Sequence, residues 1–476
     1  MTFIHSQQTG IAARSATARR GATAILCSAA FLLSSAALAQ APAESQTAPS
    51  DAVRAMREAL PGLGSCVPMS AISAAAQNST TSLDQLMRVS AQVHPSISGR
   101  QADQTAARET AESARWGYWP SPSLLTERVG AGSNDPNYPG DKSITVLGLR
   151  QTLWAGGRLD ATAARARALT EVSDYALGEQ REAIAVRTAI AFGDWWRYQH
   201  QIMATDKSIA AHRALLEQVD RRIANGAAPD VDRKLTLSRE RQLVNDRARL
   251  VSLRDGALRS LQQLVNLPLS EAELDRAPVN ALCLASPEEL AYQLIERNPR
   301  LARLRANLTA LEAAVDIRRA SRWPEIYARL ERQWGNYAQA DAPPSNRAFI
   351  GVTYQPGAGL SLESDIRSLV AQREASGHDM ASARLDLLEE FNNDWLSYNS
   401  IRERHAAILD ALEDTHAIAG SYERQYQAGR KSWLDVMNLV REQLQLELQQ
   451  VDLEANLISL SRKLAVVAAG LSNWGR

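Results

Sequence analysis

A proline-free stretch from Arg158 to Ala224 constrains the fold of this chain more than any other feature. From Ile184 onward, residues that suit a helix seam recur in alternating steps of four and three positions: Ile184, Thr188, Ala191, Trp195, Tyr198, Ile202, Thr205, Ile209, His212, Leu216, Val219 and Ile223. This spacing is typical of a helix that packs against another helix along its whole length. At a rise of about 1.5 Å per residue, the helix predicted over 158–224 is about 100 Å long.

A second proline-free stretch, at residues 361–427, has the same character. Its seam consists of Phe391, Trp395, Tyr398, Arg402, His405, Leu409, Leu412 and His416. The motif Asp-Trp-x-x-Tyr begins at Asp394 in this stretch and at Asp194 in the first one, an offset of 200 positions. Repetition at a fixed offset predicts that the chain is a tandem duplication of two halves.

Shorter landmarks keep the same order in both halves. A Trp-Pro dipeptide, at Trp119 and at Trp323, precedes two runs of strand length, and a glycine, Gly226 or Gly429, follows each long helix. Glycine just past the last helical residue commonly ends a helix. We expect a first repeat over 81–280, with strands at 123–131 and 142–153, a long helix at 158–224 and a return helix at 231–266. We expect a second repeat over 281–472, with strands at 325–335 and 346–356, a long helix at 361–427 and a return helix at 432–470.

The predicted strand at 325–335 has two chemically different faces. Ile326, Ala328, Leu330 and Trp334 alternate with Tyr327, Arg329, Glu331 and Gln333. An apolar face and a polar face over about nine residues suit a tilted transmembrane strand with a wet lumen behind it. The alternative is a small soluble sheet that helices cover on one face.

Four transmembrane strands cannot close a barrel by themselves. An open sheet edge in hydrocarbon leaves backbone groups unpaired, at a cost of several kcal/mol for each group. Several copies of the chain must therefore pool their strands. Three copies would supply twelve strands, and a barrel of about eight strands is only just wide enough to be filled by its own side chains. The long helices, present in the same number of copies, would form a hollow bundle below the barrel.

Residues 1–39 have the pattern of a secretory signal peptide. Three arginines precede an apolar run over 22–37, and Ala37-Leu38-Ala39 has the small-x-small form of a signal-peptidase site. The apolar run is shorter than the about 20 residues that a retained membrane anchor needs. We expect export, with an irregular lead-in over 40–80.

Two cysteines remain after this cleavage, Cys66 and Cys283. In an oxidising compartment they could form a disulfide, and two unpaired thiols are the alternative. Cys27 lies inside the apolar run rather than just after it, which argues against a lipid-anchored N-terminus.

Composition excludes other classes of function. The chain has 53 basic and 53 acidic residues, a balance that supports neither a nucleic-acid partner nor a polybasic membrane anchor. No nucleophile elbow, paired-cysteine metal motif or paired-histidine helix motif is present. We therefore expect no enzymatic activity, no cofactor and no metal site.

The order of these features resembles the TolC family of outer-membrane efflux and secretion channels. The resemblance covers about residues 80–472 and rests on the duplicated plan, on Gln151-Thr-Leu-Trp-Ala-Gly-Gly157 and on Tyr426-Gln-Ala-Gly429-Arg-Lys-Ser-Trp-Leu-Asp435-Val436. It implies a mainly α fold, a homotrimer with a twelve-stranded β-barrel in the cell outer membrane, and a periplasmic tunnel of long antiparallel coiled-coil helices. The implied partners are outer-membrane lipid, a periplasmic membrane-fusion adaptor and an inner-membrane pump, either an ABC or a proton-driven one.

The resemblance also implies roles for individual residues. The reversals at Gly226 and Gly429 would be the tips that meet the adaptor. The entrance and its gating would involve Tyr426, Lys431, Asp435 and Asn438 in the second half, and either Asp230 or Asp232 in the first half. In the family, an acidic position like Asp435 narrows the entrance, whereas Asn438 falls where a second acidic residue can occur. An aspartate in the first turn of a helix is also a routine partner of the helix dipole.

These observations predict an outer-membrane channel-tunnel of a tripartite efflux or type I secretion system. The rival class is a soluble periplasmic coiled-coil scaffold with a small covered sheet. The sequence does not distinguish protein cargo from drugs or metals, although the missing lipid-anchor cysteine favours the secretion branch.

Overall fold

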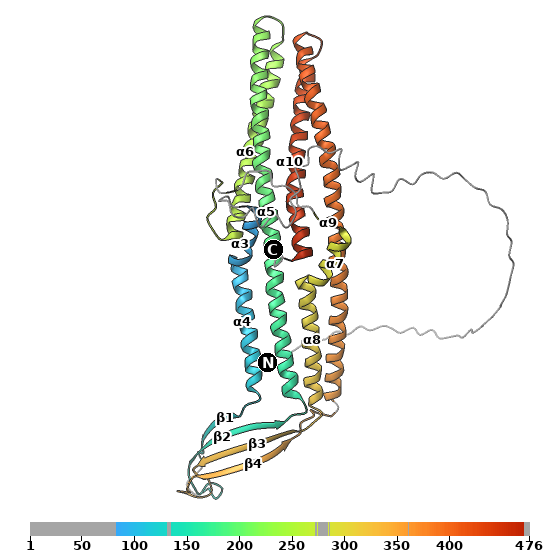
Figure 1. The fold of residues 1–476 in the computed structure, drawn as a ribbon. Coiled ribbons are helices and arrows are strands. Elements are labelled where there is room, and N and C mark those ends of the chain that lie inside the picture. Colours follow the sequence, from blue (N-terminus) through green and yellow to red (C-terminus); the bar gives the residue numbers. More distant parts are fainter. Residues whose placement is uncertain are drawn as a thin grey trace, which may run out of the picture. The chain divides into compact units, whose positions relative to one another are not determined.

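A computed structural model of the chain describes residues 82–130, 135–271, 274, 284, 286–359 and 361–470. The predicted signal peptide, the lead-in and the pair Cys66 and Cys283 lie outside these residues. Each half contains two short helices, two strands, a long helix and a return helix (Figure 1). The first half comprises α3 (Leu83–Val93), α4 (Pro95–Trp116), β1 (Ser121–Arg128), β2 (Ser143–Trp154), α5 (Arg158–Ala224) and α6 (Asp230–Val265). The second comprises α7 (Pro287–Arg297), α8 (Pro299–Ala320), β3 (Glu325–Trp334), β4 (Ser345–Thr353), α9 (Ser361–Gln427) and α10 (Trp433–Ala469).

The mainly helical class that we expected is confirmed, and the two long helices organise it. Nine of the twelve seam residues predicted for α5 are buried. Toward the helix reversals the helices pack in the order α6, α5, α10, α9, and toward the sheet in the order α4, α5, α8, α9. Figure 1 shows the two hairpins, α5–α6 and α9–α10, side by side. Helices α6 and α9 therefore form the two outer edges of the row near the reversals.

The largest core cluster surrounds the aromatic motif of α5. Phe192 and Trp195 are fully buried, with ring centroids 5.6 Å apart. They pack with α3 and α10. Helix α10 approaches α5 closely at Gly193, where an added Cβ would lie 3.2 Å from the main-chain oxygen of Ala455. Among the described residues, no helix combines the length and the apolar character needed to cross a membrane.

The four strands form one antiparallel sheet in the order β1-β2-β3-β4, so β2 and β3 join the two halves. Their bounds differ from our expectation by up to three residues. Strand β1 includes Pro122, which an edge strand tolerates because that residue needs no N–H partner. Strand β4 ends at Thr353, the partner of Glu325, because β3 begins there.

The two faces of the sheet differ chemically, although Arg128 and Arg332 lie on the mainly apolar one. Because paired residues share a face, the register places Leu124, Leu147, Leu149, Leu330, Ile350 and Val352 on one side. These side chains are exposed, Ile350 by 81% and Leu124 by 71%. The other face carries charged and aromatic side chains in mutual contact. The Arg150 guanidinium lies 3.8 Å from the centroid of Tyr327, and Arg329 lies 3.2 Å from Glu331. Among the described residues, no helix packs across either face.

Candidate functional site at the helix reversals

The two long helices end in the same backbone motif. At the first reversal, the N–H of Gly226 donates to the oxygen of Ile223 at 2.9 Å, and that of Ala227 donates to Arg222 at 2.8 Å. At the second, Gly429 donates to Tyr426 and Arg430 donates to Gln425, each at 2.9 Å. This is the Schellman pattern, which requires a left-handed residue just past the helix. Gly226 and Gly429 have φ of 69° and 73°, a conformation that favours glycine.

Asp435 takes part in the cap of the second return helix. The Ser432 hydroxyl donates to Asp435 Oδ2 at 2.8 Å, and the Asp435 N–H donates to Ser432 Oγ at 3.2 Å. The side-chain hydrogen bond from Ser432 lowers the pKa of the Asp435 carboxyl. Asp435 therefore stays ionised in this position and stabilises the start of α10.

The two first-half aspartates face different groups. Asp230 lies 3.0 Å from Lys234 on its own helix, and this hydrogen bond lowers the pKa of Asp230. Asp232 is half-buried, and burial raises its pKa, against the opposing charge of Arg222. The charge of Asp232 also raises the pKa of Tyr426 on the other hairpin, whereas Asp230 pairs along its own helix α6.

Tyr426 and Arg222 connect the two hairpins. The Arg222 guanidinium donates to the main-chain oxygens of Tyr426 at 3.0 Å and Gln427 at 3.2 Å, and it lies 4.5 Å from the centroid of the Tyr426 ring. A cation at the C-terminal end of a helix is favoured by the helix dipole. Tyr426 is buried, and this burial raises its pKa. The first hairpin thus caps the end of α9.

Trp433 makes the second connection. Its indole Nε1 donates to Thr236 Oγ1 of α6 at 2.9 Å, and its ring lies 4.8 Å from that of Tyr426. Both aromatic rings belong to a core cluster with Leu215, Val219, Val436 and Met437. Side chains from α5, α6, α9 and α10 therefore meet in one packed unit behind the reversals.

The remaining predicted residues lie on the outside of this unit. The Lys431 ammonium lies 4.2 Å from the centroid of the Tyr422 ring, and no ion pair with Asp435 forms among the described residues. Asn438 is exposed. Of the predicted residues, the structure thus buries Tyr426, leaves Asp232 half-buried, leaves Asp230 and Asn438 exposed, and holds Asp435 in the cap of α10.

Sequence reasoning missed Arg222, Trp433 and Thr236. For Arg222 the sequence held one indication, since it stands in the last turn of a helix, where the helix dipole favours a cation. In the structure, however, Arg222 binds the end of α9 rather than its own helix, and only the packing of the two hairpins reveals this contact. Within the described ranges, no three His, Cys, Asp or Glu side chains gather as a metal site would require.

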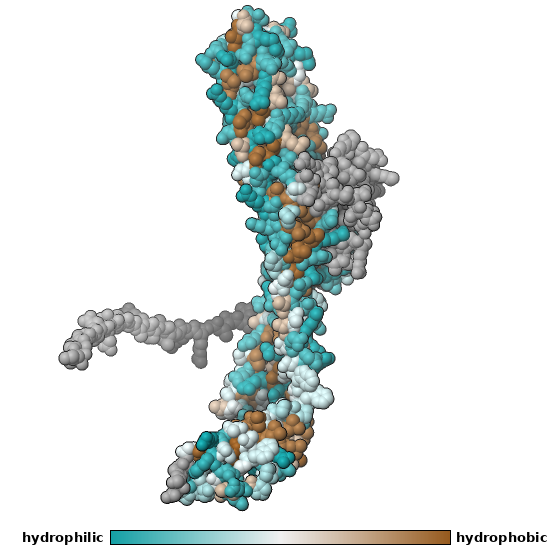
Figure 2. Space-filling model, turned by 90° about the vertical axis from the view of Figure 1, so that its left-hand side faces the viewer, coloured by the Kyte–Doolittle hydropathy of each residue, from teal (hydrophilic) through white to brown (hydrophobic). Residues whose placement is uncertain are grey.

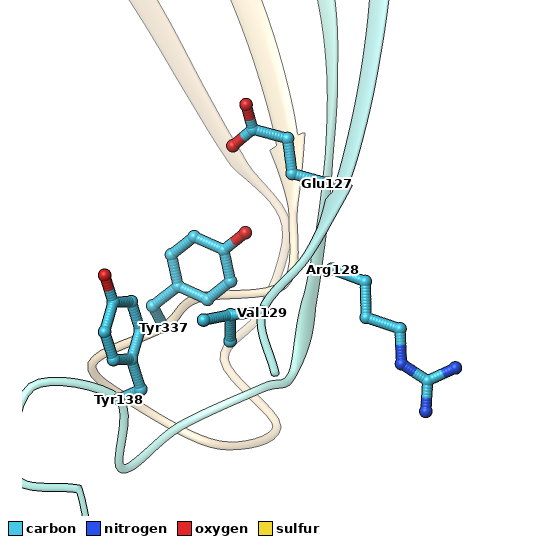
Figure 3. Close-up of a pocket in the computed structure, with 5 residues that line it drawn as sticks. All are labelled: Glu127, Arg128, Val129, Tyr138 and Tyr337. Atoms are coloured by element: carbon cyan, nitrogen blue, oxygen red, sulfur yellow. The ribbon is translucent and has the colours of Figure 1, made fainter. Parts of the chain in front are cut away.

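A hollow of about 450 Å³ lies at the far end of the strands, lined by Glu127, Arg128, Val129, Tyr138 and Tyr337. The two tyrosine rings meet edge to face, with 5.5 Å between centroids, and Figure 3 shows Arg128 pointing away from them. Asp141 Oδ2 accepts a hydrogen bond from the N–H of Asn336 at 2.8 Å. These contacts fasten the β1–β2 loop to the β3–β4 loop.

The sequence and the fold are similar to those of known outer-membrane proteins. Residues 290–470 match the family model described as outer membrane efflux protein. The fold is similar to the outer-membrane channel OprN, with a TM-score of 0.70 and 18% identity over 82% of this chain and 89% of that one. The Vibrio cholerae outer membrane protein VceC has a TM-score of 0.70 and 15% identity over 82% of this chain and 96% of that one. The Campylobacter jejuni outer membrane channel CmeC has a TM-score of 0.70 and 12% identity over 87% of this chain and 90% of that one. No curated protein sequence matches the chain.

The fold is thus that of an outer-membrane channel protein. The family model and these folds confirm the resemblance to the TolC family of outer-membrane efflux channels.

Proposed function

We propose that this protein is the outer-membrane channel-tunnel of a tripartite export system and that it works as a homotrimer. The observation that carries the proposal is the sheet, because its apolar face is exposed over all four strands while its other face holds a network of charges. Such a sheet is stable in hydrocarbon only if the polar face lines a wet lumen and both edges are paired.

The edges of the sheet favour assembly in a ring. Strands β1 and β4 have one free edge each, so β4 of one copy can pair with β1 of the next. A head-to-tail interface of this kind closes into a ring when the rotation fits. Three copies of the four strands give a barrel of twelve.

Four exposed tryptophans would lie at one surface of the membrane. Trp116, Trp119, Trp154 and Trp323 are exposed where the sheet meets the helices, each by 44% or more. Figure 2 shows hydrophobic side chains gathered at this junction. Tryptophan is enriched at membrane–water interfaces, which supports placing this level at the inner surface of the outer membrane and the helices in the periplasm.

The reversals would form the periplasmic entrance. Asp435, and with it Asp232 rather than Asp230, would supply acidic positions near the threefold axis, because both stand six residues past the glycine of their reversal. Tyr426 and Lys431 would help to hold the closed state, and Asn438 would stand at a position without charge. The tips at Gly226 and Gly429 would receive the membrane-fusion adaptor, which connects an ABC or proton-driven pump.

We expect the pump, rather than this chain, to select which cargo is exported. The match to an efflux family supports small-molecule efflux, and type I secretion of protein uses a similar tunnel. The soluble-scaffold alternative requires helices that cover one face of the sheet, and the described residues offer none.

Fractionation with planar-bilayer recording tests the proposal. The purified protein should stay in the outer-membrane fraction after a carbonate wash and should form ion-conducting pores. Release into the soluble fraction without pore formation would support the scaffold. A deletion strain assayed for both secreted proteins and drug sensitivity then separates the two kinds of cargo.

A further inference from the structure

The outer edges of the helical row near the reversals carry opposite charges. Helix α6 has eight Arg and Lys residues against five Asp and Glu residues. The part of α9 from Glu403 to Gln427 has two arginines against five Asp and Glu residues. A head-to-tail ring would bring α6 of one copy beside α9 of the next.

Three of the eight basic residues of α6 point away from its partner within the chain. The α5 side of α6 is defined by buried Thr236 and Leu250 and by the ion pair of Arg247 with Asp206. At 3.6 residues per turn, Arg241, Arg249 and Arg259 lie on the half of α6 turned away from α5. All three are exposed, and none forms an ion pair with another described residue.

Three of the five acidic residues in this part of α9 have the matching position. Buried His405, which lies 3.0 Å from Glu454, and buried Leu412 define the side of α9 that faces α10. Glu403, Asp410 and Asp414 lie on the opposite side. They too are exposed and without an ion pair among the described residues.

The two sets also match in height. Arg222 of α5 contacts the last residues of α9, so the two reversals lie at one level. Arg249 lies 19 residues from the start of α6, and Asp410 lies 17 residues from the end of α9. Arg241 and Asp414 lie 11 and 13 residues from the same ends. With a rise of about 1.5 Å per residue, the two members of each pair differ in height by about 3 Å, in opposite directions for the two pairs, so one register serves both.

Small residues accompany both sets of charges. Ala248 stands beside Arg249 on α6, and Ala407 stands one turn from Asp410 on α9, both exposed. Small side chains let two helices approach, so charged side chains on either side of the contact can meet. Figure 2, which views the α6 side, shows hydrophilic residues interspersed with hydrophobic ones on the upper part of this surface.

We infer that the outward face of α6 docks on the outward face of α9 of a second copy, with Arg241 opposite Asp414 and Arg249 opposite Asp410. The inference rests on the trimeric channel proposed above and specifies its helical seam. Exposed ion pairs contribute little stability, whereas complementary charge fixes register and rejects wrong pairings. The pairs therefore set the register in which three chains close.

Cysteine cross-linking tests the docking directly. In a full-length chain whose three cysteines are replaced by serine, the pair Arg249→Cys and Asp410→Cys should give covalently closed trimers on oxidation. The two positions cannot meet within one chain, because α5 and α10 lie between α6 and α9. The pair Arg241→Cys and Glu403→Cys is the matched control, because these positions differ in height by about 20 Å and should leave monomers.

Charge exchange provides a second readout. Arg249→Asp alone and Asp410→Arg alone should lower the temperature at which the trimer dissociates in detergent, and the two together should restore it. Trimers that conduct ions but neither cross-link nor show this restoration would overturn the seam and leave the channel intact. Loss of both trimer and conductance in the cysteine-free parent would instead contradict the proposed function.

Discussion

The guanidinium of Arg222, on the first long helix, donates a hydrogen bond to the main-chain oxygen of Tyr426 near the end of the second one, at 3.0 Å. The same cation lies over the Tyr426 ring and reaches Gln427 as well. One side chain thus ties the two hairpins together beside the proposed entrance. Opening of that entrance requires the hairpins to move, so this contact should resist opening.

Replacement of Arg222 should loosen the closed state. Arg222→Ala removes both hydrogen bonds and the ring contact, so we expect a several-fold rise in single-channel conductance in planar bilayers. Arg222→Lys keeps the charge but loses the planar fork, and it should give an intermediate conductance. Wild-type conductance in both variants would show that Arg222 does not hold the entrance.

Reversal of the charge at Lys431 should also open the channel. Lys431 lies beside the Tyr422 ring and close enough to lower the pKa of Asp435. Lys431→Glu loses this cation–π contact and adds a like charge near Asp435, so conductance should rise. Arg430→Glu is the control, because Arg430 is exposed and its side chain makes no ion pair among the described residues. Equal effects from the two variants would count against a specific latch.

The indole of Trp433 should stabilise the start of α6. Trp433→Phe leaves the Thr236 hydroxyl without its donor in a buried site, at a cost of about 1 to 3 kcal/mol. We expect faster hydrogen exchange in the first turns of α6. Thr236→Val removes the other partner, and the double variant should exchange little faster than Trp433→Phe alone. Additive effects would mean that the two side chains act separately.

Asp232 should make gating depend on pH. Burial raises the pKa of Asp232 in this structure, whereas an aspartate exposed by movement of the hairpins would titrate near 3.9. The arrangement with the higher pKa binds protons more tightly, so acidification from neutral pH favours the arrangement seen here, which we propose is closed. Conductance should therefore fall as pH drops through the raised pKa toward the ordinary value. Asp232→Asn should remove this dependence, whereas Asp230→Asn, at the aspartate paired with Lys234, should retain it.

A charged substitution on the face of the sheet that carries Ile350 should impair membrane assembly. Ile350→Arg places a cation on the apolar face, where arginine at the bilayer midplane costs about 2 to 4 kcal/mol. We expect less protein in the outer-membrane fraction. We also expect that the protein's migration on a denaturing gel will no longer change when the sample is heated, as it does for a folded barrel. Gln333→Glu adds a charge on the polar face beside Arg347, which donates to Gln333, and should assemble normally. Normal assembly of both variants would mean that the Ile350 face does not contact lipid.

Local patterns predicted the helices well. The four-three spacing of α5 and the glycine past each long helix depend on neighbours in the chain, and the structure has α5 and α9 at Arg158–Ala224 and Ser361–Gln427. Strand ends were less predictable, because Thr353 ends β4 only through its pairing with Glu325 in another strand.

The site was harder to predict for a related reason. The resemblance named Tyr426 and the two first-half aspartates, but only the folded chain shows that Asp232 is half-buried whereas Asp230 is exposed. Likewise, Arg222 binds residues about 200 positions away in the chain, so no local spacing reveals the contact.

Native mass spectrometry of the protein extracted from the outer membrane in mild detergent tests the central claim most directly. The account predicts a complex of three identical mature chains, since four strands per chain need two further copies to close a barrel. A single chain that remains soluble and folded without detergent would contradict it.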